Sequence, residues 1–250
     1  MPLMPVVLRE ARDTLVPDMD GPQGPLPPVL LALTVVTGLV DAFSYLLLGH
    51  VFVANMTGNV VFMGFALAGA PGFSTFASGV ALASFAAGAL AGGVTVHLAR
   101  AHRGRQLLHA LSLQTAFVIA ALVVTLISGA PYTGGVRFAL IVLLGVGLGV
   151  QNAAALALGV PDLTTTVLTR TLTGAVSDST LARGPGSRAG RRVLSAAAML
   201  TGAFAGALGA LHVHPALPLV IAVVLLAGAI TAVGLLSRGD APWTRPSAGR

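Results

Sequence analysis

The chain has no cysteine and very few charged residues. Without a thiol among its 250 residues, it can form neither a disulfide framework nor a cysteine-based metal or nucleophile site. Charged residues make up 9% of the composition, whereas soluble domains average about a quarter. So few charges cannot cover a core when 55% of the residues are hydrophobic. The composition therefore indicates an integral membrane protein whose partner is the lipid bilayer.

Lysine is also absent, so all 14 basic residues are arginines. The net charge of +6 would suit a protein that binds nucleic acid. Most of the arginines, however, lie in loops and tails beside apolar segments, a distribution typical of membrane orientation. We therefore expect no nucleic-acid partner.

Catalytic patterns are missing as well. The sequence has no glycine-rich phosphate loop, nucleophile elbow or carboxylate pair, so we expect no enzymatic activity. The six histidines lie mostly at the ends of apolar segments, and His212 and His214 are not spaced to share a helical face. We therefore expect no metal site and no cofactor.

Eight apolar segments follow one another along the chain and predict an all-α, polytopic helical membrane protein. Six are long enough to cross a hydrocarbon core of about 30 Å, which takes roughly 20 residues. The other two, residues 51–70 and 162–180, carry many polar side chains, so we expect broken or re-entrant helices there. The six predicted spans are residues 28–49, 74–99, 106–129, 136–159, 192–212 and 215–236.

Polar segments flank the apolar region on both sides. Residues 1–27 lack the apolar core and cleavage site of a signal peptide, so we expect a disordered cytoplasmic tail there. Residues 237–250 are expected to form a second disordered cytoplasmic tail. Between them, residues 28–236 are expected to form a single transmembrane domain.

Motifs of the first half recur in the second half in the same order. They predict an internal duplication, with halves at about residues 28–129 and 136–236. At offsets of 111, 112 and 114 residues, the matches pair Gly38–Ala42 with Gly149–Ala153, Met56–Asn59 with Leu168–Thr171, and Gly88–Gly92 with Gly202–Gly206.

The arginine positions favour six spans over eight. With six spans and cytoplasmic termini, twelve arginines lie inside, Arg137 lies at the outer edge and Arg170 in a polar segment. With eight spans, the alternative, the cluster Arg100–Arg105 would move outside. Three spans in each half make the two halves inverted, which is a recurring architecture of secondary transporters.

The candidate site of the first half centres on Asp41, the one acid well inside a predicted span. A carboxylate at that depth either titrates or pairs with a cation, so we expect a proton- or cation-coupling residue. The alternative is a hydrogen-bonded acid that caps a broken helix. Asn55, Thr57 and Asn59 can converge on one face, and Gly58 permits unwinding that exposes backbone groups to a solute. The alternative for these residues is hydrogen bonding between helices.

The second half carries matching polar residues. Its candidate residues are Gln151, Asn152, Thr165, Thr169 and Arg170. The repeat makes Asn152 the neutral counterpart of Asp41, although helix–helix bonding would explain both amides equally well. Arg170 can pair with Asp41, bind an anion, or extend its charge toward the membrane surface.

Two strings of residues resemble the motifs of the YoaK-like family of bacterial multipass membrane proteins, catalogued as domain of unknown function 1275. They are TGLVDAFSYLLLGHVFVANMTGNVVFMGFALAG, residues 37–69, and GLGVQNAAALALGVPDLTTTVLTRTLT, residues 147–173. The resemblance covers roughly residues 28–236. It implies a bacterial inner-membrane protein with about six spans, and it implies no established substrate. Arg170 departs from the pattern, because a small residue is expected at that position.

Taken together, these patterns favour a small-solute transporter or permease with a polar site near the membrane midplane, coupled to protons or cations through Asp41. The expected ligand is an unidentified small polar solute or ion, and assembly into a homo-oligomer is compatible with the sequence. The alternative is a non-transporting membrane scaffold or assembly component whose polar residues only hold helices together.

Overall fold

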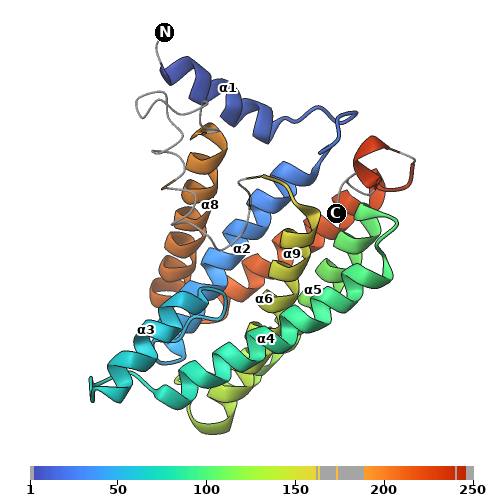
Figure 1. Ribbon diagram of the computed structural model, residues 1–250. Coiled ribbons are helices and arrows are strands. Elements are labelled where there is room, and N and C mark those ends of the chain that lie inside the picture. Colours follow the sequence, from blue (N-terminus) through green and yellow to red (C-terminus); the bar gives the residue numbers. More distant parts are fainter. Residues whose placement is uncertain (1–2, 162, 164–172, 174–188, 240, 246–250) are drawn as a thin grey trace.

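The computed structural model describes residues 3–161, 163, 173, 189–239 and 241–245, and within these residues all regular secondary structure is helical. Six of the described helices are long and apolar enough to cross a membrane. They pack side by side in one bundle (Figure 1). The prediction of an all-α polytopic membrane protein is confirmed.

The six long helices begin and end within a few residues of the predicted spans, because local signals mark their ends. Proline in the first turn starts α2 and α9. The hydroxyl of Ser74 caps α4 by accepting a hydrogen bond from the amide of Ala77. Gly159, in a left-handed conformation, ends α6. The bounds are α2 Leu26–Leu47, α4 Thr75–Leu98, α5 Arg103–Ser128, α6 Gly134–Leu158, α8 Ala189–Leu208 with the π-helical extension η2 Gly209–Val213, and α9 Leu217–Leu236.

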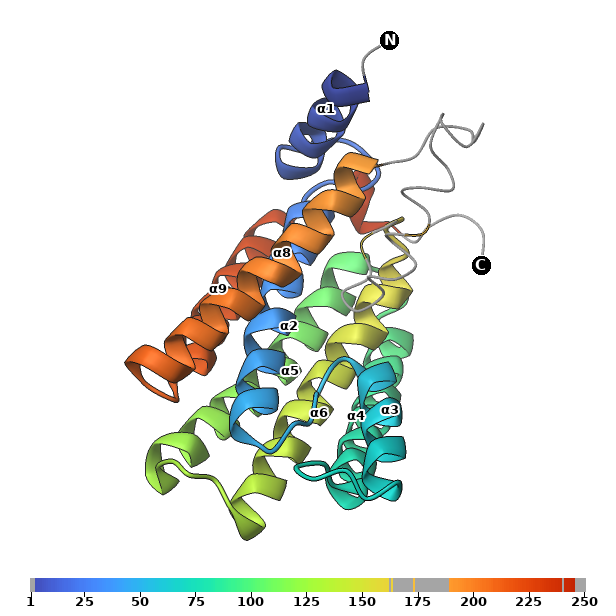
Figure 2. The same cartoon turned by 90° about the vertical axis from the view of Figure 1, so that its left-hand side faces the viewer.

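The bundle has two distinct ends. Helices α2, α5 and α8 begin at one end, where α4, α6 and α9 finish (Figures 1 and 2); we call it the tail end, because it adjoins the N-terminal and C-terminal segments α1 (Leu3–Leu15) and 241–245. The opposite end, the loop end, holds the connection from α5 to α6 and the segment between α2 and α4. Arg137 in the first turns of α6 lies at the loop end. The other described arginines belong to segments of the tail end: Arg9, Arg12, Arg100, Arg103, Arg105, Arg191, Arg192, Arg238 and Arg245.

The contacts between helices repeat the duplication seen in the sequence. Helix α2 packs along α8, and α6 packs along α4. A Cβ atom added at Gly206 would lie 2.9 Å from the carbonyl oxygen of Leu39, and one added at Gly92 would lie 2.9 Å from that of Val150. Leu39 and Val150 are 111 residues apart, and Gly92 and Gly206 are 114 apart, so one contact occurs twice at the predicted offsets.

The two halves are inverted, as predicted. Helices α2 and α6 are the matching first spans of the two halves, and they run in opposite directions through the bundle (Figure 2). The close contacts also join one half to the other. Helix α2 of the first half packs against α8 of the second half, and α6 of the second half packs against α4 of the first half.

The N-terminal segment is helical, so the prediction of a disordered tail over residues 1–27 is wrong for residues 3–15. Residues Leu3–Leu15 form α1, which packs against α8 (Figure 1). The carboxylate of Glu10 accepts a 2.9 Å hydrogen bond from the amide of Gly190 in the first turn of α8. It thereby satisfies one of the amides that every helix start leaves without an intrahelical partner.

The C-terminal prediction of disorder is likewise wrong for residues 241–245, because Trp243 anchors them. This side chain is 1% exposed, and its ring fills the space that a Cβ atom at Gly24 would occupy. The buried guanidinium of Arg103 donates to the carbonyl oxygens of Pro22 at 3.0 Å and Leu158 at 2.6 Å. It also donates at 3.5 Å to the carbonyl of Trp243, so one side chain joins four segments at the tail end.

Candidate functional site

The segment between α2 and α4 enters the bundle from the loop end and leaves it at the same end. The chain turns at Gly49 and His50, both with left-handed φ angles, and runs back along α2 as far as Asn55 (Figure 2). Helix α3, Met56–Leu67, then returns to the loop end. Its 12 residues measure about 18 Å, too short to cross a core of about 30 Å. The prediction of a broken or re-entrant helix at residues 51–70 is confirmed, and the one predicted at residues 162–180 lies almost entirely outside the described residues.

Asp41 of α2 holds the tip of this re-entrant segment. Its side chain is 2% exposed, and Oδ1 accepts hydrogen bonds of 2.9 Å from the amides of Val53 and Ala54. The other oxygen, Oδ2, accepts a hydrogen bond from the side-chain amide of Asn55. Because α3 begins directly after Asn55, the carboxylate lies at the positively polarised start of the half-helix. A hydrogen-bonded acid at a broken helix is the alternative to ion coupling that the sequence left open, although the backbone amides that Asp41 binds belong to the turn before α3.

Asn59 closes the turn from within α3. Its Oδ1 accepts a 2.9 Å hydrogen bond from the amide of Phe52, and its Nδ2 donates at 2.6 Å to the carbonyl of the same residue. A Cβ atom at Gly58 would come within 2.7 Å of the Phe52 ring, so a glycine is needed for this close packing. The predicted convergence of the two amides is present, and both bind their own segment. Thr57 is exposed on the surface of α3.

Aromatic rings pack around the base of the re-entrant segment. Tyr45 of α2 stacks on Phe52 with 5.0 Å between ring centroids. Phe62 of α3 lies 5.5 Å from Phe52 and 5.3 Å from Phe73, which precedes α4. These contacts tie the turn to the helices on both sides of it. Hydrogen bonds thus hold the tip of the segment, and aromatic packing holds its base.

The candidate residues of the second half do not join the Asp41 cluster by any hydrogen bond between described residues. Asn152 donates from Nδ2 to the carbonyl of Leu148 in its own helix at 2.9 Å. Gln151 points to a different cluster, which includes Thr37, one helical turn from Asp41 on α2. The remaining candidates of this half lie outside the described residues: Thr165, Thr169 and Arg170.

A second polar cluster joins α5, α6 and α2 in the interior. Gln114 of α5 donates from Nε2 to Oε1 of Gln151 at 2.5 Å, and Gln151 donates from Nε2 to the hydroxyl of Thr37 at 2.8 Å. All three side chains are at most 1% exposed. Sequence reasoning missed Gln114 and Thr37. The signal was the lone amide of Gln114 inside a long apolar run, which needs a partner at that depth.

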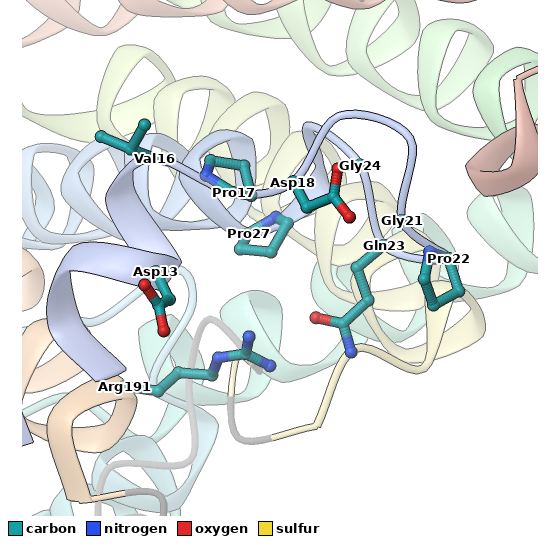
Figure 3. A pocket seen from close by; sticks show the side chains of 10 residues that line it. All are labelled: Asp13, Val16, Pro17, Asp18, Gly21, Pro22, Gln23, Gly24, Pro27 and Arg191. Atoms are coloured by element: carbon teal, nitrogen blue, oxygen red, sulfur yellow. The ribbon is translucent and has the colours of Figure 1, made fainter. Parts of the chain in front are cut away.

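An open pocket of about 560 Å³ lies at the tail end of the bundle (Figure 3). The connection from α1 to α2 and the side chain of Arg191 line it. Its polar groups come from Asp13, Asp18, Gln23 and Arg191. Arg191 also donates to the carbonyl of Pro161 at 3.3 Å. The pocket is separate from the Asp41 cluster, because Asp41 lies toward the loop end of α2.

Comparison with known proteins places these features in a family. Residues 29–233 match the family described as protein of unknown function DUF1275. The UPF0700 transmembrane protein YoaK of Bacillus subtilis (strain 168) is 36% identical over 155 residues, which are 60% of this chain and 64% of the relative. The match thus spans slightly less than two thirds of that curated relative. No solved structure matches the chain significantly.

Proposed function

The chain belongs to the DUF1275 family of membrane proteins, and from that premise we propose that it is a permease for a small polar solute. The observation that carries the proposal is the half-helix α3, whose start is held at membrane depth by Asp41. Interrupted helices within inverted repeats surround the substrate sites of many secondary transporters. Non-helical backbone at that depth is tolerated where it is buried in protein or lines a water-filled cavity.

The helix contacts support movement of two units against each other. Close glycine contacts join α2 to α8 in one unit and α4 to α6 in the other. Gln151 of α6 donates its hydrogen bond to Thr37 of α2 across the boundary between these units. A rocking movement would therefore break and re-form polar contacts in the interior, as alternating access requires.

Coupling through Asp41 would act on the tip of α3. Donors from Val53, Ala54 and Asn55 already bind both oxygens of the carboxylate. A proton or cation that neutralises the carboxylate would weaken these charge-assisted hydrogen bonds. In this proposal, binding of the coupling ion therefore loosens the tip of α3.

We also propose an orientation in which the tail end faces the cytoplasm of a bacterial inner membrane. The described arginines lie at that end except Arg137, and an excess of arginine marks the cytoplasmic side. A role in transport rather than catalysis is proposed because the sequence contains no catalytic pattern.

One observation favours a second candidate, a membrane scaffold that transports nothing. The polar side chains of the Asp41 cluster bind one another or the backbone, as they would if their task were only to hold helices together. Water access to the start of α3 separates the two candidates, because a permease has to hydrate that region during its cycle.

Solute uptake into proteoliposomes tests the proposal. The purified full chain is reconstituted, and uptake of a panel of radiolabelled polar solutes, uncharged and charged, is compared with uptake by protein-free vesicles. The permease predicts that at least one solute enters faster with the protein present. No movement of any solute across the panel would reject the permease and leave the scaffold.

Cysteine labelling in the same vesicles gives an independent answer, because the chain has no native cysteine. Thr57→Cys at the start of α3 is compared with Leu90→Cys, an exposed apolar position of α4. The permease predicts that a hydrophilic thiol reagent labels position 57 and not position 90. The absence of labelling at both positions favours the scaffold.

A further inference from the structure

The cluster of Gln114, Gln151 and Thr37 is a directional chain of hydrogen bonds. Gln114 donates to Gln151, Gln151 donates to Thr37, and the hydroxyl of Thr37 donates to the carbonyl of Leu33 at 3.0 Å. Each donor thus has an acceptor within α5, α6 or α2. The group that has no partner among the described residues is an acceptor at the head of these hydrogen bonds, the side-chain oxygen Oε1 of Gln114.

The surroundings of Gln151 agree with this direction of the hydrogen bonds. Its Nε2 faces two oxygens, the hydroxyl of Thr37 at 2.8 Å and the carbonyl of Leu33 at 3.4 Å. Turning this amide over would place its oxygen against the carbonyl oxygen of Leu33. In the structure, Oε1 of Gln151 faces Gln114, which approaches it with its NH₂ group. Oε1 of Gln114 then points away from the chain and needs a donor from elsewhere.

This chain of hydrogen bonds lies near the middle of the membrane-spanning region. Thr37 and Gln114 each come 11 residues after the start of their helices, which is about 16 Å along α2 and α5. Gln114 is 0% exposed, so surface water does not reach its oxygen in this conformation. A buried acceptor without a donor is unfavourable and rare in native proteins. Its presence calls for a hydrogen-bond donor from outside the chain, either water or a ligand.

We propose that Oε1 of Gln114 binds the transported solute, and that the solute is uncharged and carries an O–H or N–H donor. This inference rests on the proposed function. An amide oxygen accepts one hydrogen bond well, whereas an ion at this depth needs an opposite charge or several ligands. The described hydrogen-bond partners in the chain are amides, a hydroxyl and a backbone carbonyl, and none is ionised.

The site is also connected to the re-entrant segment. Thr37 and Asp41 are four residues apart on α2, so they lie one turn apart on the same face of that helix. A shift of α2 that frees the tip of α3 from Asp41 would also move Thr37. The hydroxyl of Thr37 accepts the hydrogen bond of Gln151, so the hydrogen bonds to Gln114 would change as well. Solute binding at Gln114 and movement of α3 are thereby linked through one helix.

Two measurements test the proposal. The first is water-edited solid-state NMR of the wild-type chain in lipid bilayers, with nitrogen-15 in the side chains of its four glutamines. Water is the probe, as the smallest uncharged donor. We expect transfer of magnetisation from water to the side-chain amide of Gln114. The absence of transfer from water to the Gln114 amide would overturn the inference. This measurement uses the wild-type chain, so it does not depend on the folding of any variant.

The second measurement is uptake by proteoliposomes of urea and glycerol, with acetate and methylammonium as charged comparisons. Gln114→Met keeps the size of the side chain and removes the acceptor, so we expect uptake of the uncharged solutes to fall at least about tenfold. The matched control is Gln106→Met, which alters an amide two turns earlier on α5 that donates to the carbonyl of Val96. The control should retain uptake within about twofold of wild type.

The outcomes separate this inference from the permease itself. If charged solutes alone cross, or if Gln114→Met matches its control, the permease stands and the site at Gln114 is rejected. If no solute crosses, the permease is rejected and the solute site at Gln114 is rejected with it, and water contact at Gln114 then reports only a hydrated acceptor. Transfer of magnetisation from water to Gln114, together with loss of uptake in Gln114→Met, supports the inference.

Discussion

The carboxylate of Asp41, in the last turns of α2, accepts a hydrogen bond from the side chain of Asn55, the residue directly before α3. The two residues are 14 positions apart, and the chain between them makes the re-entrant turn. A charged acceptor beside a helix start matches the helix dipole, and this one also binds the amides of the turn before α3. The shape of the first half therefore depends on this one buried side chain.

Replacement of Asp41 should affect stability according to how many acceptors remain. Asp41→Leu leaves the donors of Val53, Ala54 and Asn55 without partners, and each buried donor costs about 1–3 kcal/mol. Asp41→Asn keeps one oxygen for the two backbone amides, and the amide of Asn55 can turn to match it. We expect a large fall in Tm for Asp41→Leu and a small fall for Asp41→Asn, measured by circular dichroism in detergent. Equal falls in Tm would contradict the capping role.

The repeated glycine contact predicts paired effects in the two halves. Gly92→Leu and Gly206→Leu each force a side chain against the backbone of the facing helix, at Val150 and Leu39. Overpacking of this kind costs about 1–3 kcal/mol. We expect similar losses of thermal stability in the two variants. The control is Gly93→Leu, because a Cβ atom at Gly93 meets no atom within 4 Å. A comparable loss in the control would mean that close helix approach is not the cause.

The guanidinium of Arg103 predicts a fluorescence change at the tail end. The chain has one tryptophan, Trp243, which is buried beside this arginine. Arg103→Gln removes the hydrogen bonds to Pro22 and Leu158, so residues 241–245 should loosen and Trp243 should contact water. We expect a red shift of the tryptophan emission. Arg105→Gln, at an exposed position two residues away, should leave the emission maximum unchanged.

Patterns that repeat along one chain segment could be read from the sequence. Apolar length and end signals gave the six spans within a few residues, and the polarity of Asn55 and Asn59 within an apolar run indicated that residues 51–70 do not cross. The duplication was visible because the helix contacts require glycine at the same places in both halves, as at Gly92 and Gly206.

Contacts between distant segments could not be read in this way. Glu10 caps α8 at Gly190, 180 residues later, and no local pattern links the two. The partnership of Gln114 with Gln151 depends on how α5 and α6 rotate against each other, which composition does not determine. For Asp41, burial alone favoured ion coupling. The backbone amides that donate to its carboxylate come within reach only when the chain folds back onto α2.

The central claim is that α3 re-enters the bundle instead of crossing the membrane, and the sidedness of three single cysteines tests it most directly. Met19 lies before α2, Ala68 directly follows α3, and Ala101 lies between α4 and α5; all three are exposed. Each is replaced by cysteine in a separate variant and labelled in intact cells with a membrane-impermeant thiol reagent, before and after permeabilisation.

A re-entrant α3 predicts that Met19→Cys and Ala101→Cys are labelled from the same side of the membrane and Ala68→Cys from the other side. A crossing α3 would place position 68 on the side of position 19 and would move position 101 to the opposite side. Labelling of Met19→Cys and Ala68→Cys from one side would therefore contradict the account, and with it the half-helix on which the permease proposal depends.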